Sequence, residues 1–292
     1  MRVNHSILAV GINTTASEKI RIQKELMKND IMLDTASIKD IIFSIVDGKV
    51  NTYIKGKEIR NYGYVWIQSG WKTTHMAYLL HLCLESEDIQ HNMTNIHATK
   101  LSDIFFLASK GVLVPNTYFH NSLKIDDGNI GEIEKICGLP CIYKTSLGSL
   151  GNNVYLIKEK SEIKSTIRSI GGYNRYVFQE YIPNDFDYRV IIANGLPTSV
   201  CIRSRVADEY RNNVALGATE KFINVDSVSP EILKLAVNAA KALSLNWAGI
   251  DIVTSKITGV NYVLEVNRRP GLTQNSLETV AAFNYIGTLL EK

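Results

Sequence analysis

Apolar and polar residues alternate along two short segments between Trp247 and Thr273, WAGIDIVTSKITGVNYVLEVNRRPGLT. This period of two predicts a strand (GIDIV), a turn (SKITG) and a second strand (YVLEVN) that pair as a β-hairpin. Glu265 and Asn267 are two residues apart, so they point to one face, which Asp251 reaches from the partner strand. Three oxygen ligands that leave positions for water and phosphate suit Mg²⁺ in nucleotide sites. The alternative is a solvated hairpin whose polar residues alternate without binding a metal.

The first hundred residues carry the pattern of an α/β domain. Strands are predicted at Ile7 to Ile12 and from Ile31 to Leu33, and a helix between them from Ser17 to Asn29. SIVDGKV and YIKGKEI alternate like a small hairpin, and YVWIQSG has the composition of a buried strand that leads into a loop. We therefore expect a β-α-β opening and an α/β domain that ends near Asn95.

A second region begins with a helix predicted from Ala98 to Lys110, which Gly111 ends as a C-cap. Further along, LPCIYKTSLGSLGNNVYLI predicts strand, glycine-rich turn, strand, with Lys144 just before the turn. Glycines let backbone N–H groups approach a polyphosphate, and a neighbouring lysine neutralises charge. The turn is neither a Walker A loop nor a GxGxxG motif. On its own it is equally compatible with a plain hairpin that has a flexible tip.

Two further segments carry candidate nucleotide-binding groups. In VFQEYIPNDFDYRVIIANG a strand ends at QEYI, and a turn leads to Asp187 near Arg189. Such a strand exit can offer backbone groups to an adenine edge, and an acidic residue beyond it can bind ribose hydroxyls. Downstream, CIRSRVADEYRNNVALGA brings several donors close together, and guanidinium groups bind phosphate through two parallel hydrogen bonds. These donors are Arg203, Arg205, Arg211, Asn212 and Asn213. The alternative is a surface strand with ordinary charged residues.

Composition narrows the class of protein. With 292 residues, 45% apolar and 21% charged, the chain can bury a sizeable core in two or three lobes. A net charge of +3 is too small to argue for nucleic acid. No apolar run approaches the roughly 20 residues of a membrane helix, and the N-terminal run does not have the features of a signal peptide. We expect a cytoplasmic protein with no nucleic-acid or membrane partner; a homo-oligomer is compatible with the sequence.

Cysteine and histidine suggest no site by their spacing. The four cysteines lack zinc-site spacing and are predicted to be isolated buried thiols. The histidines form no HExxH pattern and have no nucleophile beside them, so none is assigned a role. The histidines considered are His75, His81, His91, His97 and His120.

The ordered set of motifs resembles the ATP-grasp superfamily, and within it the branch of the ribosomal-protein S6 modification enzyme and related amino-acid and peptide ligases. The resemblance runs from about Ala98 to the C-terminus: Lys100, Lys144 with its glycine loop, then QEYI, DYR, EYRNN, AGID and LEVNRRPG. It implies an α/β fold with a pre-ATP-grasp domain at 1–97, an N-lobe with a glycine-rich lid at 98–178, and a C-lobe with the metal site at 179–292.

The resemblance also implies a role for each motif residue in holding a nucleotide between two lobes. Lys100 and Lys144 would contact phosphates, and Asp187 would hold ribose. Arg203 and Arg211 would stabilise the transferring phosphate and the intermediate. Adenine would lie against Glu180 and the backbone of Tyr181 and Ile182. The remaining nucleotide-binding candidates are Gly148, Ser149, Gly151, Gln179 and Asn213. Asp251, Glu265 and Asn267 would hold Mg²⁺, for which Mn²⁺ is a substitute.

The chain also departs from one branch of the superfamily. Ligases that join two D-alanines carry an arginine two residues before the metal aspartate, where this chain has Gly249. PGLTQNSL nevertheless resembles the segment in which those ligases hold a substrate carboxylate, and Ser276 is the matching residue. Arg268 and Arg269 lie directly after the metal motif and point to an anionic substrate. Together with Arg189, these residues are the candidates for substrate binding.

The activity implied is ATP-dependent ligation of a carboxylate to an amine through an acyl phosphate, with release of ADP and phosphate. The substrates would be an amino acid or a peptide, and positioning and electrostatics would carry the rate without a protein nucleophile. Two alternatives stay open at this point. One is an ATP-grasp phosphotransferase that leaves phosphate on its substrate, and the other is a nucleotide-binding protein without turnover.

Overall fold

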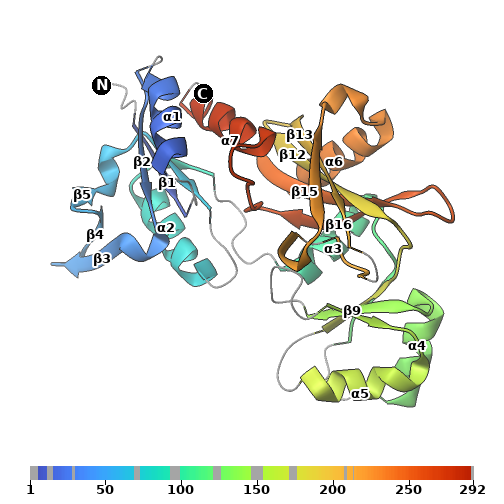
Figure 1. Cartoon of the computed structure of the whole chain (residues 1–292). Coiled ribbons are helices and arrows are strands. Elements are labelled where there is room, and N and C mark those ends of the chain that lie inside the picture. Colours follow the sequence, from blue (N-terminus) through green and yellow to red (C-terminus); the bar gives the residue numbers. More distant parts are fainter. Residues whose placement is uncertain are drawn as a thin grey trace. The chain divides into compact units, whose positions relative to one another are not determined.

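The computed structural model describes residues 6–11, 16–27, 30–68, 73–92, 99–120, 126–145, 154–170, 176–206, 209–212 and 214–290. Clustering of the chain gives two compact units, Met1–His97 with Arg268–Lys292, and Ala98–Asn267. Figure 1 shows the helices and strands of each unit. The three-part division with boundaries after residues 97 and 178 stays a prediction.

The first unit contains a parallel sheet in the order β2-β1-β6-β7. Its strands are β1 (Ser6–Val10), β2 (Met32–Ala36), β6 (Tyr64–Ile67) and β7 (Gln90–His91). Helix α1 (Ala16–Leu26) joins β1 to β2, and α2 (Thr74–Ser86) joins β6 to β7. Connections of this length are what parallel strands need, and the predicted β-α-β opening is confirmed. The helix ends at Leu26, before the predicted Asn29.

Gly11, directly after β1, illustrates a local constraint on this sheet. Its φ is +84°, and a Cβ there would collide with the backbone oxygen of Gln68. Only glycine therefore fits where the chain leaves β1 beside the end of β6.

A small antiparallel sheet adds β3 (Ile41–Val46), β4 (Lys49–Ile54) and β5 (Lys57–Glu58), as the alternation predicts. Its two turns each place consecutive residues at positive φ, the geometry of tight hairpin turns. The unit is completed by α7 (Leu277–Gly287), whose Tyr285 ring packs edge-on against Trp66 of β6 at 5.5 Å. Among the described residues, short 3₁₀ helices are η2 (Ile38–Asp40), η3 (Ile59–Asn61), η5 (Val214–Leu216) and η6 (Val225–Ser227).

The second unit begins with α3 (Lys100–Ser109), where Thr99 caps the N-terminus and accepts a hydrogen bond from the Ser102 N–H. Gly111 follows the helix at a φ of +74°, the conformation that its predicted role requires. An antiparallel sheet comes next, in the order β10-β9-β11-β8. It comprises β8 (Thr117–Tyr118), β9 (Cys141–Thr145), β10 (Val154–Ile157) and β11 (Tyr176–Glu180), with α4 (Asp127–Cys137) and α5 (Lys160–Ile170).

Buried side chains from both helices and the sheet form one core, which includes Ile133 of α4, Ile163 of α5 and Phe178 of β11. The strands on both sides of the predicted glycine-rich turn are thus confirmed as an antiparallel pair. The turn itself, with Gly148, Ser149 and Gly151, lies outside the described residues.

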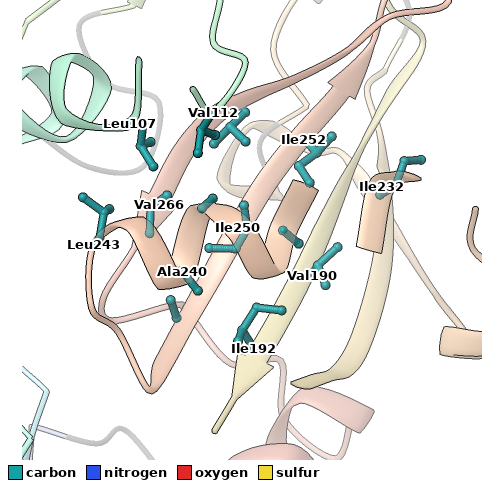
Figure 2. Close-up of a cluster of buried hydrophobic side chains, with 14 of the residues drawn as sticks. Leu107, Val112, Val190, Ile192, Ile232, Ala240, Leu243, Ile250, Ile252 and Val266 are labelled. Atoms are coloured by element: carbon teal, nitrogen blue, oxygen red, sulfur yellow. The ribbon is translucent and has the colours of Figure 1, made fainter. Parts of the chain in front are cut away.

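A five-stranded antiparallel sheet in the order β14-β13-β12-β15-β16 follows. Its strands are β12 (Phe186–Ala193), β13 (Leu196–Ser204), β14 (Thr219–Ile223), β15 (Trp247–Thr254) and β16 (Asn261–Asn267). Helix α6 (Pro230–Ala242) lies across one face, and its Ile232 and Ala240 pack against Val190, Ile250 and Ile252 (Figure 2). Burying this apolar face fixes which side chains point to the other face.

The hairpin β15–β16 contains one irregularity. Asp251 pairs with Glu265, but the next residue, Ile252, pairs with Val263, so Leu264 is an extra residue on β16. Because of this bulge, Val263 and Val266 both join the core although they are three positions apart. Within the described ranges, no helix combines the length and apolar character needed to cross a membrane.

Candidate active site

The register of the five-stranded sheet gathers charged side chains on the face opposite α6. Val190 of β12 pairs with Ile250 of β15, and both belong to the core. Their neighbours in sequence, Arg189 and Asp251, also pair with each other and therefore point the other way. Glu265 of β16 extends this row through Asp251, and Asp187, which pairs with Arg203 of β13, adds a second row on the same face.

Two arginines and two aspartates form a buried network on this face. Arg203 donates to both oxygens of Asp187, from Nε and from Nη2, each at 2.7 Å. Its Nη2 also lies 3.1 Å from Oδ2 of Asp251. Arg189 donates to both oxygens of Asp251 at 2.9 and 3.0 Å. Since Asp187, Arg203 and Asp251 are each no more than 6% exposed, these paired hydrogen bonds compensate the lost hydration of the charges.

The two aspartates of the network differ in their pKa. For Asp187, burial outweighs the pairing with Arg203 and raises the pKa to about 6. Burial acts the same way on Asp251, but the charges of Arg189 and Arg203 overcome it and hold its pKa at about 2. Because two carboxylates share Arg203, the two groups titrate as a pair, and Asp251 is the member that stays ionised.

The three predicted metal ligands lie together. Asn267 Nδ2 donates to Oδ2 of Asp251 at 3.2 Å, which leaves the amide oxygen of Asn267 as an acceptor. Glu265, opposite Asp251, accepts a hydrogen bond from Lys100 Nζ at 3.2 Å. A carboxylate oxygen can accept more than one contact, so these ion pairs leave lone pairs for a cation. The donor set, two carboxylates and an amide oxygen, fits a hard divalent ion such as Mg²⁺.

A second lysine lies near this set. Lys144 on β9 donates from Nζ to Oε1 of Gln179 at 2.8 Å, and Gln179 Nε2 donates to the Thr117 hydroxyl at 3.1 Å. Burial, with a smaller repulsion from Lys100, lowers the pKa of Lys144 to about 8, and Glu265 acts in the opposite direction. The structure therefore brings Lys100, Lys144 and Gln179 together, as the motif order predicts. The two lysines have one carboxylate, that of Glu265, to balance their two positive charges.

At the exit of β11, backbone groups of the adenine candidates already have partners. The N–H of Glu180 donates to the Asn116 carbonyl at 2.8 Å, and the Glu180 carboxylate accepts from the Asn116 N–H at 3.2 Å. The carbonyl of Ile182 accepts from Asn184 Nδ2 at 2.7 Å. A carbonyl oxygen has two lone pairs, so Ile182 can accept a second hydrogen bond. Binding of adenine by Glu180, Tyr181 and Ile182 stays a prediction.

Arg211 pairs with Glu209, the first residue of the EYRNN motif, for which no role was predicted. Its Nε and Nη2 each donate to Glu209 at 2.8 Å, and its guanidinium lies 5.0 Å from the centre of the Tyr210 ring. The hydrogen bonds from Arg211 lower the pKa of Glu209 to about 2, which keeps that carboxylate charged. Arg211 is thus orientated by an ion pair, and Glu209 could have been suspected from its spacing of two residues.

Asn212 is also buried, and its Nδ2 donates to Asn184 Oδ1 at 2.8 Å. It thereby links the strand exit after β11 to the EYRNN segment. The neighbouring candidate Asn213 lies outside the described residues.

The remaining substrate candidates belong to the other unit. Arg269 Nη2 donates to the Gly11 carbonyl at 2.6 Å. Ser276 caps α7, since its Oγ accepts from the N–H groups of Glu278 and Thr279 at 3.2 and 3.4 Å. A capping role explains this serine structurally. The substrate roles of Arg268, Arg269 and Ser276, and those of all the site residues above, stay predictions.

Comparison with known proteins places the chain in a family. The RimK-like ATP-grasp domain matches residues 98–287, so the chain belongs to the RimK-like ATP-grasp family. The "Probable alpha-L-glutamate ligase" of Coxiella burnetii (strain RSA 493 / Nine Mile phase I) is 29% identical over 256 residues, which are 85% of this chain and 81% of that protein. The "Probable alpha-L-glutamate ligase 2" of Pseudoalteromonas atlantica is 31% identical over 196 residues, 66% and 62% of the two chains.

Solved structures agree on the fold. The ATP-grasp ligase PsnB, complexed with precursor peptide PsnA2 and AMPPNP, has a TM-score of 0.68 at 18% identity and covers 99% of both chains. D-alanine–D-alanine ligase from Bacillus anthracis complexed with ATP has a TM-score of 0.63 at 17% identity over 98% of this chain and 94% of that one. The predicted fold class is confirmed. The chain is an ATP-dependent carboxylate–amine ligase of the C–N bond-forming class, as its motifs predict.

Proposed function

We propose that this ligase uses Mg-ATP to activate the carboxylate of a peptide and joins it to the amine of an acidic α-amino acid of the L-glutamate class. The names of the relatives support glutamate, and two consecutive arginines, Arg268 and Arg269, suit an anionic substrate. The single observation that carries the catalytic part is the pairing of Asp251 with Glu265 across β15 and β16, next to Lys100 and Lys144.

In this proposal the chain positions charge around the reacting groups. Lys100 and Lys144 bind phosphate oxygens, while Arg203 and Arg211 act where negative charge accumulates on the transferring group. Bound by Asp251, Glu265 and Asn267, Mg²⁺ supplies neutralisation of the polyphosphate. The peptide carboxylate takes up the γ-phosphate to give an acyl phosphate and ADP, and the amine then displaces phosphate to form the amide.

The supporting groups have distinct tasks. The network of Arg189, Arg203 and Asp187 keeps Asp251 ionised and fixes the orientation of this metal ligand. Gln179 holds the ammonium of Lys144 in place at 2.8 Å. The buried, preorganised charges give the site its electrostatic effect.

The test combines product analysis with trapping of the intermediate. The protein is incubated with Mg-ATP, L-glutamate and a peptide library, ADP release is followed, and products are identified by mass spectrometry. We expect a peptide longer by one glutamyl residue. When hydroxylamine replaces glutamate, the peptide should give a hydroxamate, which reports an acyl phosphate. Phosphate that stays on a hydroxyl of the substrate would instead establish a phosphotransferase and overturn the proposal.

Glu265→Ala tests the metal set. Turnover should fall by about 10³-fold or more, because a ligand and the counter-charge of Lys100 are both lost. The fold should persist, since the Glu265 side chain is 32% exposed. Glu132→Ala, at an exposed ion pair with Lys135 on α4, is the matched control and should keep full activity. Retention of most activity in Glu265→Ala would refute the assigned metal site.

A further inference from the structure

Two histidines and a glutamate meet in the first unit, although their spacing matches no metal motif. His81 and Glu85 are four residues apart on α2 and so share one face of the helix. The chain then turns through Asp88, at a φ of +55°, and returns as β7, which brings His91 to the same place. His81 Nδ1 lies 2.7 Å from His91 Nε2, and Glu85 Oε1 lies 3.4 Å from the same nitrogen.

The hydrogen-bond donors of the three side chains do not match their acceptors. His91 Nδ1 lies 2.8 Å from the carbonyl oxygen of Ile89, which can only accept, so Nδ1 carries a proton. In the neutral ring, Nε2 then presents a lone pair to both His81 and the Glu85 carboxylate. A proton on His81 Nδ1 satisfies the contact between the rings, but the carboxylate still faces a lone pair. One cation at the centre would satisfy all three atoms.

We propose that His81 Nδ1, His91 Nε2 and Glu85 bind a Zn²⁺ ion, with water at the fourth position. Among the described residues, these three ligand atoms lie within 4.8 Å of one another. Tetrahedral Zn²⁺ with bonds of about 2.0–2.1 Å requires its ligand nitrogens to be about 3.3 Å apart, so the rings separate by about 0.6 Å when the ion replaces the proton. His81 then carries its remaining proton on Nε2.

The surroundings of the cluster favour a bound ion. The hydrogen bond from His91 to Ile89 fixes the ring in the tautomer that a metal requires, the usual role of an outer-shell carbonyl. The ring of Tyr78 stacks with that of His81 at 6.4 Å and 22°. The His91 side chain is only 6% exposed, while that of Glu85 is 62% exposed, so one ligand is rigid and the other gives access from solvent.

The ion would connect α2 to the edge of the sheet. Strand β7 has two residues and, among the described strands, pairs with β6, through Tyr64–Gln90 and Val65–His91. A bond from His91 through the metal to His81 and Glu85 fastens this short strand to the helix. Because Zn²⁺ would bind the folded chain, it should raise the melting temperature of the protein.

The experiment is calorimetric titration of chelator-treated full-length protein with Zn²⁺ near neutral pH. It is carried out on Glu265→Ala as well as the wild type, because that variant lacks the proposed oxygen-ligand site. We expect one Zn²⁺ per chain at the histidine cluster in both proteins. Saturation should raise the melting temperature by about 5 °C.

Three variants decide the outcome. Glu85→Gln, at an exposed position, should keep the fold and lower Zn²⁺ affinity by at least about 10-fold, and His81→Gln should do the same or more. His75→Gln, on the exposed side of α2, is the matched control and should bind as the wild type does. The proposal is overturned if Glu265→Ala, whose histidine cluster is intact, binds no Zn²⁺, because the cluster is then held by hydrogen bonds alone. It is equally overturned if Glu85→Gln and His81→Gln bind Zn²⁺ unchanged.

Discussion

Two charged clusters of the second unit, the arginine–carboxylate network and the lysine pair, differ in their balance of charge. In the network, Arg189 and Arg203 face Asp187 and Asp251, so two positive groups meet two negative ones. In the pair, Lys100 and Lys144 share the influence of a single carboxylate, Glu265, and Lys144 is hydrogen-bonded to the neutral Gln179. The first cluster has equal numbers of positive and negative groups, whereas the second carries a net positive charge and gains stabilisation when an anion such as a phosphate binds.

The comparison also explains why the pKa of Lys144 is low while Asp251 stays ionised. Burial opposes the charged form in both cases. Asp251 has two guanidinium groups within hydrogen-bonding distance, but Lys144 has a second lysine nearby. A charge in this site thus keeps its ionised form where opposite charges of the chain lie within hydrogen-bonding distance, as for Asp251, and is favoured by a bound anion where its hydrogen-bond partner is neutral, as for Lys144.

The largest expected effect comes from opening the network. Arg203→Leu leaves both oxygens of buried Asp187 without their donors, so the free energy of unfolding should fall by about 3–5 kcal/mol. Urea denaturation measures it. Lys256→Leu, which removes an exposed ion pair with Asp185, is the control and should barely move the midpoint. Equal losses in the two variants would show that the network contributes no more than a surface ion pair.

Arg211 occupies an intermediate position, because it has a carboxylate partner, Glu209, but is partly exposed. Arg211→Lys removes the planar fork while keeping the charge, so turnover should fall by about 10- to 10³-fold with a much smaller change in ATP affinity. Calorimetric ATP binding measured beside steady-state turnover separates the two effects. Arg168→Lys on α5 serves as control. A loss of ATP affinity in proportion to the rate would make Arg211 a ground-state binding residue.

The smallest effect concerns the lysine pair and pH. Free Lys144 loses its proton as pH rises through about 8, whereas bound phosphate favours the charged form and raises its pKa. ATP affinity should therefore be constant at lower pH and fall above pH 8, by up to about 10-fold per pH unit. Calorimetry from about pH 7 to about pH 9.5, with proton uptake obtained from buffers of different ionisation enthalpy, measures this.

Lys144→Arg provides the control for that titration, because arginine keeps its charge over the whole range. The variant should lose the decline in affinity, whatever its absolute affinity for ATP. If the ATP affinity of wild type and variant fell with pH at the same slope, the titrating group would not be Lys144. The proposed difference in charge balance between the two clusters would then be wrong.

Much of this arrangement could be predicted from the sequence, because it depends on local patterns. The alternation in WAGIDIV and YVLEVN predicts the hairpin, and the motif order predicts that Lys100 and Lys144 belong with the metal residues. The pairing of Arg203 with Asp187 could not be predicted, since it depends on the register between β12 and β13. Likewise, His81 and His91 come together only because the chain reverses after α2 and β7 pairs with β6. Motif spacing could not predict this tertiary contact.

The bulge at Leu264 has a consequence for which kinds of genetic change the hairpin tolerates. Under strict alternation, Val263 would share a face with Glu265 and Asn267; the extra residue instead sends Val263 into the core. An in-frame deletion of Leu264 would make Val263 and Glu265 neighbours, so a continuous period of two would still place the valine in the core and the carboxylate on the opposite face. Substitutions at Leu264 keep the residue count and leave both in place. At this position, both the loss and the substitution of the bulged residue keep the core face and the metal face of the strand separate.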